Sequence, residues 1–358
     1  MLALTAVFAY GWHVNNRKIV SLAGTGQETP GALAERRKRT AYCIIFAVLA
    51  FLPMFLVNAL MSYVGNDYQN YFTYYQRIVS GGEQDVEFTY KLICLFADKI
   101  GLGFQGVYYI YCLISYTLLS LCIRKYSANY AVSYLMFFFN GYFALLGLQQ
   151  IRQFTAVVLI FYAYDYIAKR KLLPYLICVL IAGAFHVTAL VMLPFYWILH
   201  VKWRASVYVV IMCVLFPLRF FHVEIMQWLF QTFMPRYLNT NYATREFGVG
   251  INYLFMVVVT LFIVLLCERK CKKDLTVFKN GVILANIIVL FANWLPEYQR
   301  FVFYFLFPSI AYVPQLVEAE ESLKKRLLIY GVLFVIYIWY FMAVFPGSTI
   351  NPYKSILG

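Results

Sequence analysis

The chain has 358 residues, of which 63% are hydrophobic and only 13% are charged. Soluble domains carry about 25% charged residues, so this composition excludes an ordinary soluble protein and indicates a polytopic integral membrane protein. No polar stretch is long enough to fold as a separate soluble module, and we expect a single membrane domain over residues 1–358.

Apolar runs of helical length predict an all-α fold, because a backbone that crosses a bilayer must satisfy its own hydrogen bonds. About twelve transmembrane segments are expected. They are Met1–Val14, which is short for a span, Ala41–Met61, Phe104–Ile123, Tyr130–Leu146, Phe154–Ala168, Leu173–Phe185, Val187–Leu199, Ser206–Phe220, Ile251–Cys267, Val277–Leu295, Phe301–Leu316 and Leu327–Phe345. His186, in the middle of one long apolar run, predicts the break between two short helices.

Three polar stretches are expected to be loops, namely Asn15–Thr40, Ser62–Tyr90 and Phe221–Gly250. The second of them is rich in aromatic residues, and we expect it to carry short helices at the membrane interface. Placing Asn15–Thr40 in the cytoplasm makes the other two loops outer loops.

The basic residues support this orientation, because most of them then fall in cytoplasmic loops, as the positive-inside rule predicts. These are Arg17, Lys18, Arg36, Arg37, Lys38, Arg39, Arg124, Lys125, Lys169, Arg170, Lys171, Lys202, Arg204, Arg269, Lys270, Lys272, Lys273, Lys279, Lys324, Lys325 and Arg326. Topology thus explains the net charge of +14, and no nucleic-acid partner is expected. The outer side receives Asp67, Glu87, Gln149, Arg152, His186, Arg236, Arg245 and Arg300.

A polar sequence, GLQQIRQ at residues 147–153, separates two apolar runs. An arginine at mid-bilayer costs roughly 2.5–3.5 kcal/mol on insertion scales, and a place at the mouth of a helix lowers that cost. There the guanidinium and the helix N-terminus offer N–H donors and positive charge to a phosphate. We therefore interpret Arg152 as an anion-binding residue; the alternative is an arginine that contacts lipid headgroups. Arg300 begins another span and has the same two interpretations.

Two acids and a histidine are candidates for proton transfer, namely Asp67, Glu87 and His186. An acid at such a site accepts a sugar hydroxyl or acts as a general base, although Asp67 could instead cap the following helix. A neutral imidazole can take a proton from an attacking hydroxyl. The alternative for His186 is a hydrogen-bonded core residue, which is the commoner role of a lone histidine in an apolar run.

Metal and nucleotide chemistry leave no signature in the sequence. Walker, HExxH and GxSxG motifs are absent, and the eight cysteines, mostly inside apolar runs, have no Cys/His pair spaced for zinc. These motifs therefore give no indication of a cofactor. The first residues lack a positively charged region followed by a cleavage site, so no signal peptide is expected.

Four motifs stand in order along the chain: Gly65-Asn66-Asp67-Tyr68 followed by Tyr71, then Glu87, then Gln150-Ile151-Arg152-Gln153, then Phe185-His186-Val187-Thr188-Ala189-Leu190. Their order and placement resemble the EpsG family of bacterial exopolysaccharide polymerases, relatives of the Wzy-type polymerases. The resemblance covers the chain from about Ala41 to Tyr304. The family often carries an arginine shortly before the first motif, where this chain has Met61 and Ser62.

The resemblance implies a polymerase that moves a growing glycan from polyprenyl pyrophosphate to a hydroxyl of the next lipid-linked repeat unit. It implies a multi-pass protein of the bacterial inner membrane whose active site faces the periplasm or the outside. A GT-C-like fold is expected, and by analogy with lipid-linked glycosyltransferases that lack a metal cluster, no required metal is expected. The expected partners are a polyprenyl-pyrophosphate-linked oligosaccharide and membrane lipid, and a chain-length regulator is a further candidate.

The candidate site residues have three expected roles. Catalytic candidates are His186, Asp67 and Glu87; pyrophosphate-binding candidates are Arg152, Arg300, Arg236 and Arg245; glycan-binding candidates are Tyr68, Tyr71, Gln149, Gln150, Gln153 and Tyr237. Arg236 and Arg245 could instead be solvated loop residues. A ligase that moves finished glycan, a flippase and a non-catalytic scaffold are alternative functions. A flippase should need a polar path across the bilayer, which these spans hardly offer.

Overall fold

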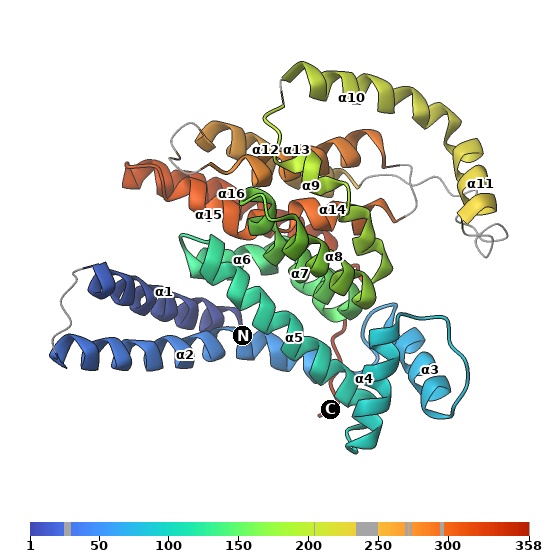
Figure 1. Ribbon diagram of the computed structural model, residues 1–358, viewed down its shortest axis with the longest axis horizontal. Helices are drawn as coiled ribbons and strands as arrows, with labels where there is room; N and C mark the ends of the chain where they lie inside the picture. The colour runs from blue at the N-terminus through green and yellow to red at the C-terminus, as the bar shows by residue number, and fades with distance from the viewer. Residues whose placement is uncertain are drawn as a thin grey trace.

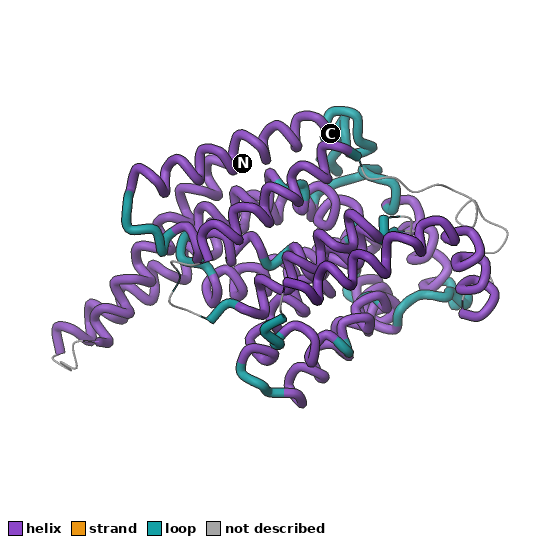
Figure 2. Tube along the Cα trace, turned by 90° about the horizontal axis from the view of Figure 1, so that it is seen from above, coloured by secondary structure: helices purple, strands orange, loops and turns teal. Residues whose placement is uncertain are grey.

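The computed structural model describes residues 1–24, 30–203, 205–233, 250–268, 271, 274–293 and 297–357. These residues form helices joined by loops, and they contain no strand beyond an isolated antiparallel bridge between Met61 and Ser355. The predicted all-α fold is therefore confirmed (Figure 2).

The helices of the first half are α1 (Leu2–Gly24), α2 (Pro30–Ala59), α3 (Tyr68–Val79), α4 (Phe88–Lys99), α5 (Gly103–Tyr126), α6 (Tyr130–Phe139), the π-helix η1 (Phe143–Gln149) and α7 (Ile151–Ala168). The second half has α8 (Leu172–Phe185), the 3₁₀-helices η2 (Val187–Met192) and η3 (Arg219–Phe221), α9 (Phe195–Leu199), α10 (Ala205–Leu218), α11 (His222–Phe233), α12 (Ile251–Cys267), α13 (Thr276–Phe291), α14 (Tyr298–Leu306), α15 (Ser309–Val317) and α16 (Leu323–Val344). In Figure 1, α7 lies within the bundle, where it packs against α5 and α8.

Four helical stretches are long and apolar enough to cross a membrane: α2, α5, Tyr298–Val317 and α16. Six result if two bent pairs each count as one span, namely α6 with η1, bent by 74°, and α10 with α11, bent by 87°. The described residues thus form several membrane-compatible helices. The expected number of about twelve spans also counts shorter helices such as α8, α12 and α13, and it stays a prediction.

The predicted loop Asn15–Thr40 is wrong, because α1 continues to Gly24 and α2 already begins at Pro30. The polar residues of this stretch are good helix formers, and proline fits the first position of a helix. Arg39 pairs with Glu35 one turn earlier at 2.7 Å and donates to Asn15 on α1 at 2.9 Å. The charged side chains therefore join two helices. The predicted loop Phe221–Gly250 is also wrong in part, since α11 occupies its start.

The predicted run Tyr130–Leu146 is not one helix. Asn140 and Gly141 end α6, and Gly141 adopts φ +77°, the left-handed conformation with which glycine commonly ends a helix. The chain then forms η1 through Gln149, and α7 begins at Ile151, earlier than the predicted Phe154. The polar sequence at residues 147–153 is thus the end of a π-helix followed directly by the first turn of α7.

The predicted break at His186 is confirmed, since α8 ends at Phe185 and His186 is extended (φ −156°, ψ 116°). The following run Val187–Leu199 is not a single helix, however. It divides into η2 and α9, with Pro194 between them, because proline lacks the N–H that would continue the hydrogen-bond pattern.

Gly147 lets η1 approach α2 closely. A Cβ atom at Gly147 would lie 2.2 Å from the side-chain nitrogen of Asn58, which donates to the Tyr116 hydroxyl at 2.7 Å. Both Asn58 and Gly147 are buried, so the side-chain amide has little room to move. This contact fixes the end of η1, and with it the start of α7.

We expect Gly147→Ala to destabilise the protein by about 1–3 kcal/mol, because the added methyl group overpacks the contact with Asn58. The matched control is Gly331→Ala in α16, where an added Cβ meets nothing within 4 Å and alanine is the better helix former. Thermal unfolding in detergent compares the two variants. Equal melting temperatures for both would contradict the close packing of Gly147.

Candidate active site between α4, α7 and α8

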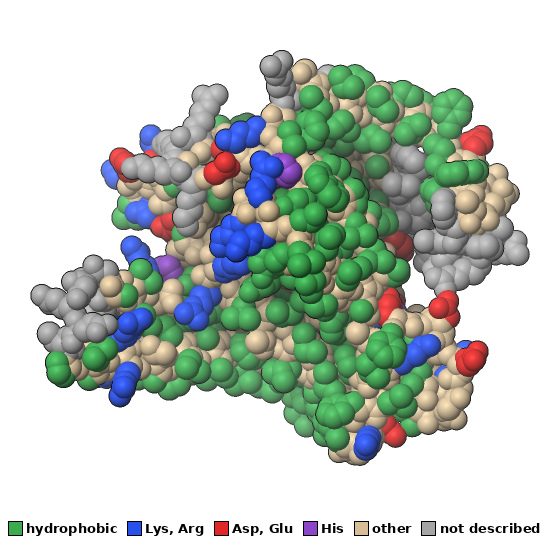
Figure 3. All heavy atoms as spheres, in the orientation of Figure 1, with side chains coloured by type: hydrophobic (Ala, Val, Ile, Leu, Met, Phe, Trp, Pro, Cys, Tyr) green, Lys and Arg blue, Asp and Glu red, His purple; other side chains and the backbone are tan. Residues whose placement is uncertain are grey.

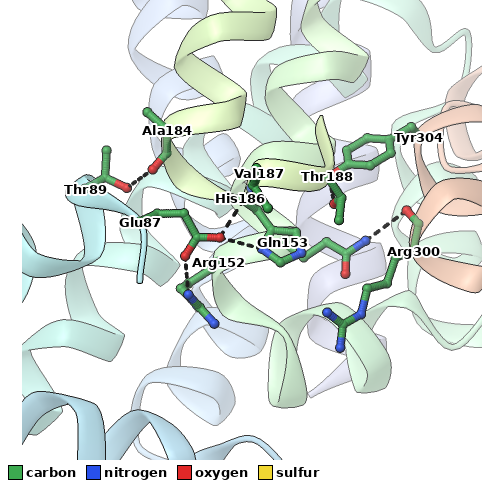
Figure 4. A network of polar contacts seen from close by, with 10 residues as sticks. All are labelled: Glu87, Thr89, Arg152, Gln153, Ala184, His186, Val187, Thr188, Arg300 and Tyr304. Atoms are coloured by element: carbon green, nitrogen blue, oxygen red, sulfur yellow. Dashed lines mark hydrogen bonds and ion pairs between the residues drawn. The ribbon is translucent and has the colours of Figure 1, made fainter. Parts of the chain in front are cut away.

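Glu87 is the centre of the polar cluster in Figure 4. It precedes the first residue of α4, yet its side chain makes no capping bond to that helix. Its Oε2 atom forms an ion pair with Nη1 of Arg152 on α7, and its Oε1 atom lies 3.1 Å from Nδ1 of His186. The backbone N–H of Val187 also donates to Oε1, at 3.3 Å. One carboxylate therefore joins three segments that are far apart in the sequence.

His186 is oriented by this carboxylate. An ionised carboxylate only accepts hydrogen bonds, so Nδ1 of His186 carries the proton that points at Glu87. In the neutral ring, Nε2 then keeps its lone pair, and this buried atom has no hydrogen-bond partner among the described residues. The contact fixes the tautomer that can accept a proton at Nε2, as carboxylates do for catalytic histidines.

Arg152 is held by two aromatic rings as well as by Glu87. Its Cζ atom lies 5.1 Å from the ring centre of Tyr71 and 5.4 Å from that of Tyr90, within the range of cation–π attraction. The Tyr90 hydroxyl donates to the backbone carbonyl of Tyr71 at 2.8 Å, which ties the two rings together. The side chain of Arg152 is only 16% exposed, so its charge is fixed in place and poorly screened by solvent.

Arg300 is the more accessible arginine, with 31% of its side chain exposed. It lies in the first turn of α14, where its Nε pairs with Glu297 at 3.1 Å. Gln153 donates to the backbone carbonyl of Arg300 at 2.9 Å and so connects α7 to α14. Figure 4 shows the guanidinium groups of Arg152 and Arg300 on the same side of the network. Two positive charges therefore face one region from two helices.

Asp67 precedes the first residue of α3 and makes no side-chain capping bond there, so the structure gives no support to the capping alternative. The turn before it packs on the end of η1: Gly65 has φ +76°, and a Cβ atom there would lie 2.7 Å from Cγ of Gln149. The Gly-Asn-Asp motif and the polar sequence at residues 147–153 thus meet in space, although the sequence separates them widely.

The two acids have opposite pKa shifts. Burial alone would raise the pKa of Glu87, but the hydrogen bond from His186 and the charge of Arg152 prevail and lower it to about 2. Burial raises the pKa of Asp67, and the nearby charges of Arg300 and Arg152 oppose that rise only in part. Glu87 therefore stays ionised and is a weak base, whereas Asp67 accepts a proton more readily.

The other predicted residues are less clearly placed in the cluster. Gln150 precedes α7, and its buried Oε1 has no hydrogen-bond partner among the described residues. Tyr68 is buried against the rings of Tyr63, Phe104 and Tyr108, and the ring of Tyr71 is also covered by protein. Arg236, Tyr237 and Arg245 lie outside the described residues.

Sequence reasoning missed two partners of the arginines. Glu297 stands three residues before Arg300, a spacing that brings side chains together on a helix, so this pair could have been found. No local pattern marks Tyr90 as a partner of Arg152, because their contact joins α4 to α7.

Two cavities among the described residues lie away from this cluster. They have volumes of about 350 and 510 Å³ and share Lys202, Asp274 and Thr276 in their linings, and the larger one also reaches Ala168 at the far end of α7. Neither lining includes a residue of the cluster around Glu87, so the candidate site is defined by its polar contacts. Among the described residues, no three His, Cys, Asp or Glu side chains are grouped to hold a metal ion.

The sequence model of the EpsG family matches residues 44–355 of the chain. The chain belongs to the EpsG family. Membership of the EpsG family suggests a polysaccharide polymerase-like role for this membrane protein. The match contains Glu87, Arg152, His186 and Arg300, so the EpsG family assignment applies to the part that carries the candidate site. No curated protein and no solved structure matches the chain.

We expect Glu87→Ala to destabilise the protein by about 3 kcal/mol, because it leaves the buried charge of Arg152 without its carboxylate. The matched control is Glu35→Ala, which removes a more exposed ion pair with Arg39; such pairs contribute at most about 1 kcal/mol. Thermal unfolding in detergent distinguishes the two. If the melting temperature of Glu87→Ala falls no further than that of Glu35→Ala, the cluster does not stabilise the fold.

The low pKa of Glu87 predicts how the cluster responds to acid. A carboxyl group stabilises the fold when its pKa is lower in the folded chain than in the unfolded chain. For Glu87 this stabilisation is complete above the pKa in the unfolded chain, 4.5, and is lost as the pH falls toward about 2. The difference in melting temperature between the wild-type protein and Glu87→Gln should therefore be constant above about pH 5 and shrink below about pH 4.5. A difference that does not change with pH over that range would rule out this assignment.

Proposed function

We propose that this protein is a polymerase of polyprenyl-pyrophosphate-linked oligosaccharide repeat units, which transfers the growing glycan to a hydroxyl of the next lipid-linked unit. The observation that carries the proposal is the Glu87 carboxylate, which binds both His186 and Arg152. It places a potential base beside fixed positive charge, and glycosyl transfer from a pyrophosphate needs both. Membership of the EpsG family supports the same class of reaction.

His186 is the general base in this proposal. The acceptor hydroxyl gives its proton to Nε2 while its oxygen attacks the anomeric carbon, and the bond from that carbon to the pyrophosphate oxygen breaks. Glu87 holds the Nδ1 proton and stabilises the positive charge that forms on the ring. Glu87 is itself unsuited to be the base, because its pKa of about 2 makes it a weak proton acceptor and both of its oxygens are engaged.

The arginines stabilise the leaving pyrophosphate, on which negative charge builds up as the bond breaks. Arg300 is the direct ligand, since its side chain is partly exposed and its partner Glu297 is itself 39% exposed and can move away. Arg152 acts chiefly through its fixed charge, because Glu87 already occupies its Nη1 atom. Arg236 and Arg245, which lie outside the described residues, are proposed as further contacts.

Asp67 and the glutamines bind the sugar hydroxyls. Gln150 and Gln153 each have a buried side-chain oxygen without a hydrogen-bond partner among the described residues, and such atoms favour a ligand that donates hydrogen bonds. Gln149 lies against the turn that leads to Asp67. Stacking of a sugar on Tyr68, Tyr71 or Tyr237 stays a prediction.

The proposed site lies at the outer face of the bacterial inner membrane, in a GT-C-like fold of about twelve spans. In support, α7 has Arg152 in its first turn and ends just before Lys169-Arg170-Lys171, so the candidate site and this basic cluster are at opposite ends of one helix. In Figure 3, Lys and Arg side chains gather mainly on the left part of the visible face. By the positive-inside rule, the basic end is cytoplasmic.

Purified protein that is given a lipid-linked oligosaccharide should produce a ladder of polymers on a gel. We expect His186→Gln and Arg300→Ala to lower the rate about 100-fold or more, through loss of the base and of the leaving-group contact. Arg152→Lys should retain part of the rate, because it keeps the charge but not the paired geometry with Glu87.

The matched control is Arg77→Ala on α3, where the arginine is exposed and makes only a long contact of 3.4 Å to Gln84. It should leave the ladder unchanged. A single unchanged band from wild-type protein, across several repeat-unit substrates, would refute polymerisation and favour a ligase or a flippase. A normal ladder from His186→Gln would refute only the role of His186 as the base, and not polymerisation itself.

A further inference from the structure

The end of the chain lies against the segment that precedes α3. After α16 the tail turns back, and residues 349–356 run antiparallel to residues 60–65. Three backbone bonds join the two segments: Ile356 N–H to the Leu60 carbonyl at 2.9 Å, Ser62 N–H to the Lys354 carbonyl at 3.0 Å, and Gly65 N–H to the Thr349 carbonyl at 3.3 Å.

Side chains strengthen this contact. The Tyr353 hydroxyl donates to the backbone carbonyl of Val57 at the end of α2, at 2.7 Å, and Ile350 is buried in the hydrophobic core. Residues 351–354 are exposed, so the tail adds little apolar burial to the bundle beyond Ile350. Its main interactions are therefore the hydrogen bonds to residues 57–65.

Residues 60–65 lead directly to Asp67. They belong to no helix, so their N–H and carbonyl groups need partners from elsewhere in the protein. The tail supplies partners for Leu60, Ser62 and Gly65. Gly65, at the last of these bonds, is the residue that packs on Gln149. The tail thus holds the turn whose position relative to η1 decides where the Asp67 carboxylate lies.

We propose that residues 349–356 are a strap that positions Asp67 in the site. The strap does not touch the substrate. It fixes the backbone from Leu60 to Gly65 and thereby the position of Asp67, two residues further along the chain. The inference rests on the proposed function, because Asp67 is there a ligand of the sugar. It also places the C-terminus on the same face of the protein as the candidate site.

The test compares a chain that ends at Gly347, which lacks the strap, with a chain that ends at Ile356, which keeps all three backbone bonds. Hydrogen exchange of the amides of residues 60–67 should be much faster without the strap, while exchange within α7 stays the same. The value of kcat should fall about 100-fold, with a much smaller change in KM, because a displaced Asp67 no longer orients the bound sugar for attack while the arginines still hold the pyrophosphate. The control chain should match the wild-type protein in all of these measurements.

Asp67→Asn decides whether the strap acts through Asp67. In that background, removal of the strap should lower kcat little further, because the two changes affect the same step. A full additional 100-fold loss would overturn the proposal in favour of a general structural role. Unchanged exchange at residues 60–67 in the shortened chain would overturn it as well, and that result does not depend on whether the protein makes polymer.

A cross-link keeps the test decisive if the shortened chain does not fold. Met61 and Ser355 face each other in the antiparallel bridge, so Met61→Cys combined with Ser355→Cys should form a disulfide in the full-length protein and retain activity. Neither single variant should give the cross-linked peptide by mass spectrometry. Failure of the double variant to cross-link would overturn the strap, whereas absence of polymer from wild-type protein would refute only the proposed function.

Discussion

The buried ion pair between Glu87 and Arg152 is the interaction on which the arrangement of the site depends. A buried charge is tolerated only when its partners compensate for lost solvation. The carboxylate of Glu87 contacts Arg152, His186 and a backbone N–H. The guanidinium of Arg152 contacts that carboxylate and two aromatic rings. These partners come from α3, α4, α7 and η2. The requirement to solvate two charges inside the protein therefore brings four helices together at one place.

The same pair has a consequence for catalysis. In the proposed reaction, Arg300 supplies the accessible positive charge for the pyrophosphate, because Glu87 neutralises part of the charge of Arg152. In return, neither Glu87 nor Arg152 needs to reorganise when charge develops in the transition state, and such preorganisation is a large part of enzymatic rate enhancement. In the proposed reaction, a partly exposed arginine and a buried one thus serve binding and turnover separately.

The sequence predicted helices where apolar runs are long and unbroken, as in α2, α5 and α16, and it predicted the break at His186, where one polar residue interrupts such a run. It failed at Asn15–Thr40, because charge indicates a loop only when the residues are also poor helix formers. Topology placed Glu87, Arg152 and His186 on one side, but their contact could not be predicted, since each partner lies on a different helix. The strap had no signature either, because most of its hydrogen bonds join backbone groups.

Several residues of the candidate site stand just before helices. Asp67, Glu87, Gln150, His186 and Glu297 immediately precede α3, α4, α7, η2 and α14. The contacts of Arg152 and Gln153 bring these helix starts together. Helix starts carry the positive end of the helix dipole, and at η2 the Val187 N–H donates to Glu87. The helix starts therefore offset part of the negative charge of the two acids, Asp67 and Glu87. The chain therefore interrupts its helices where these polar side chains meet.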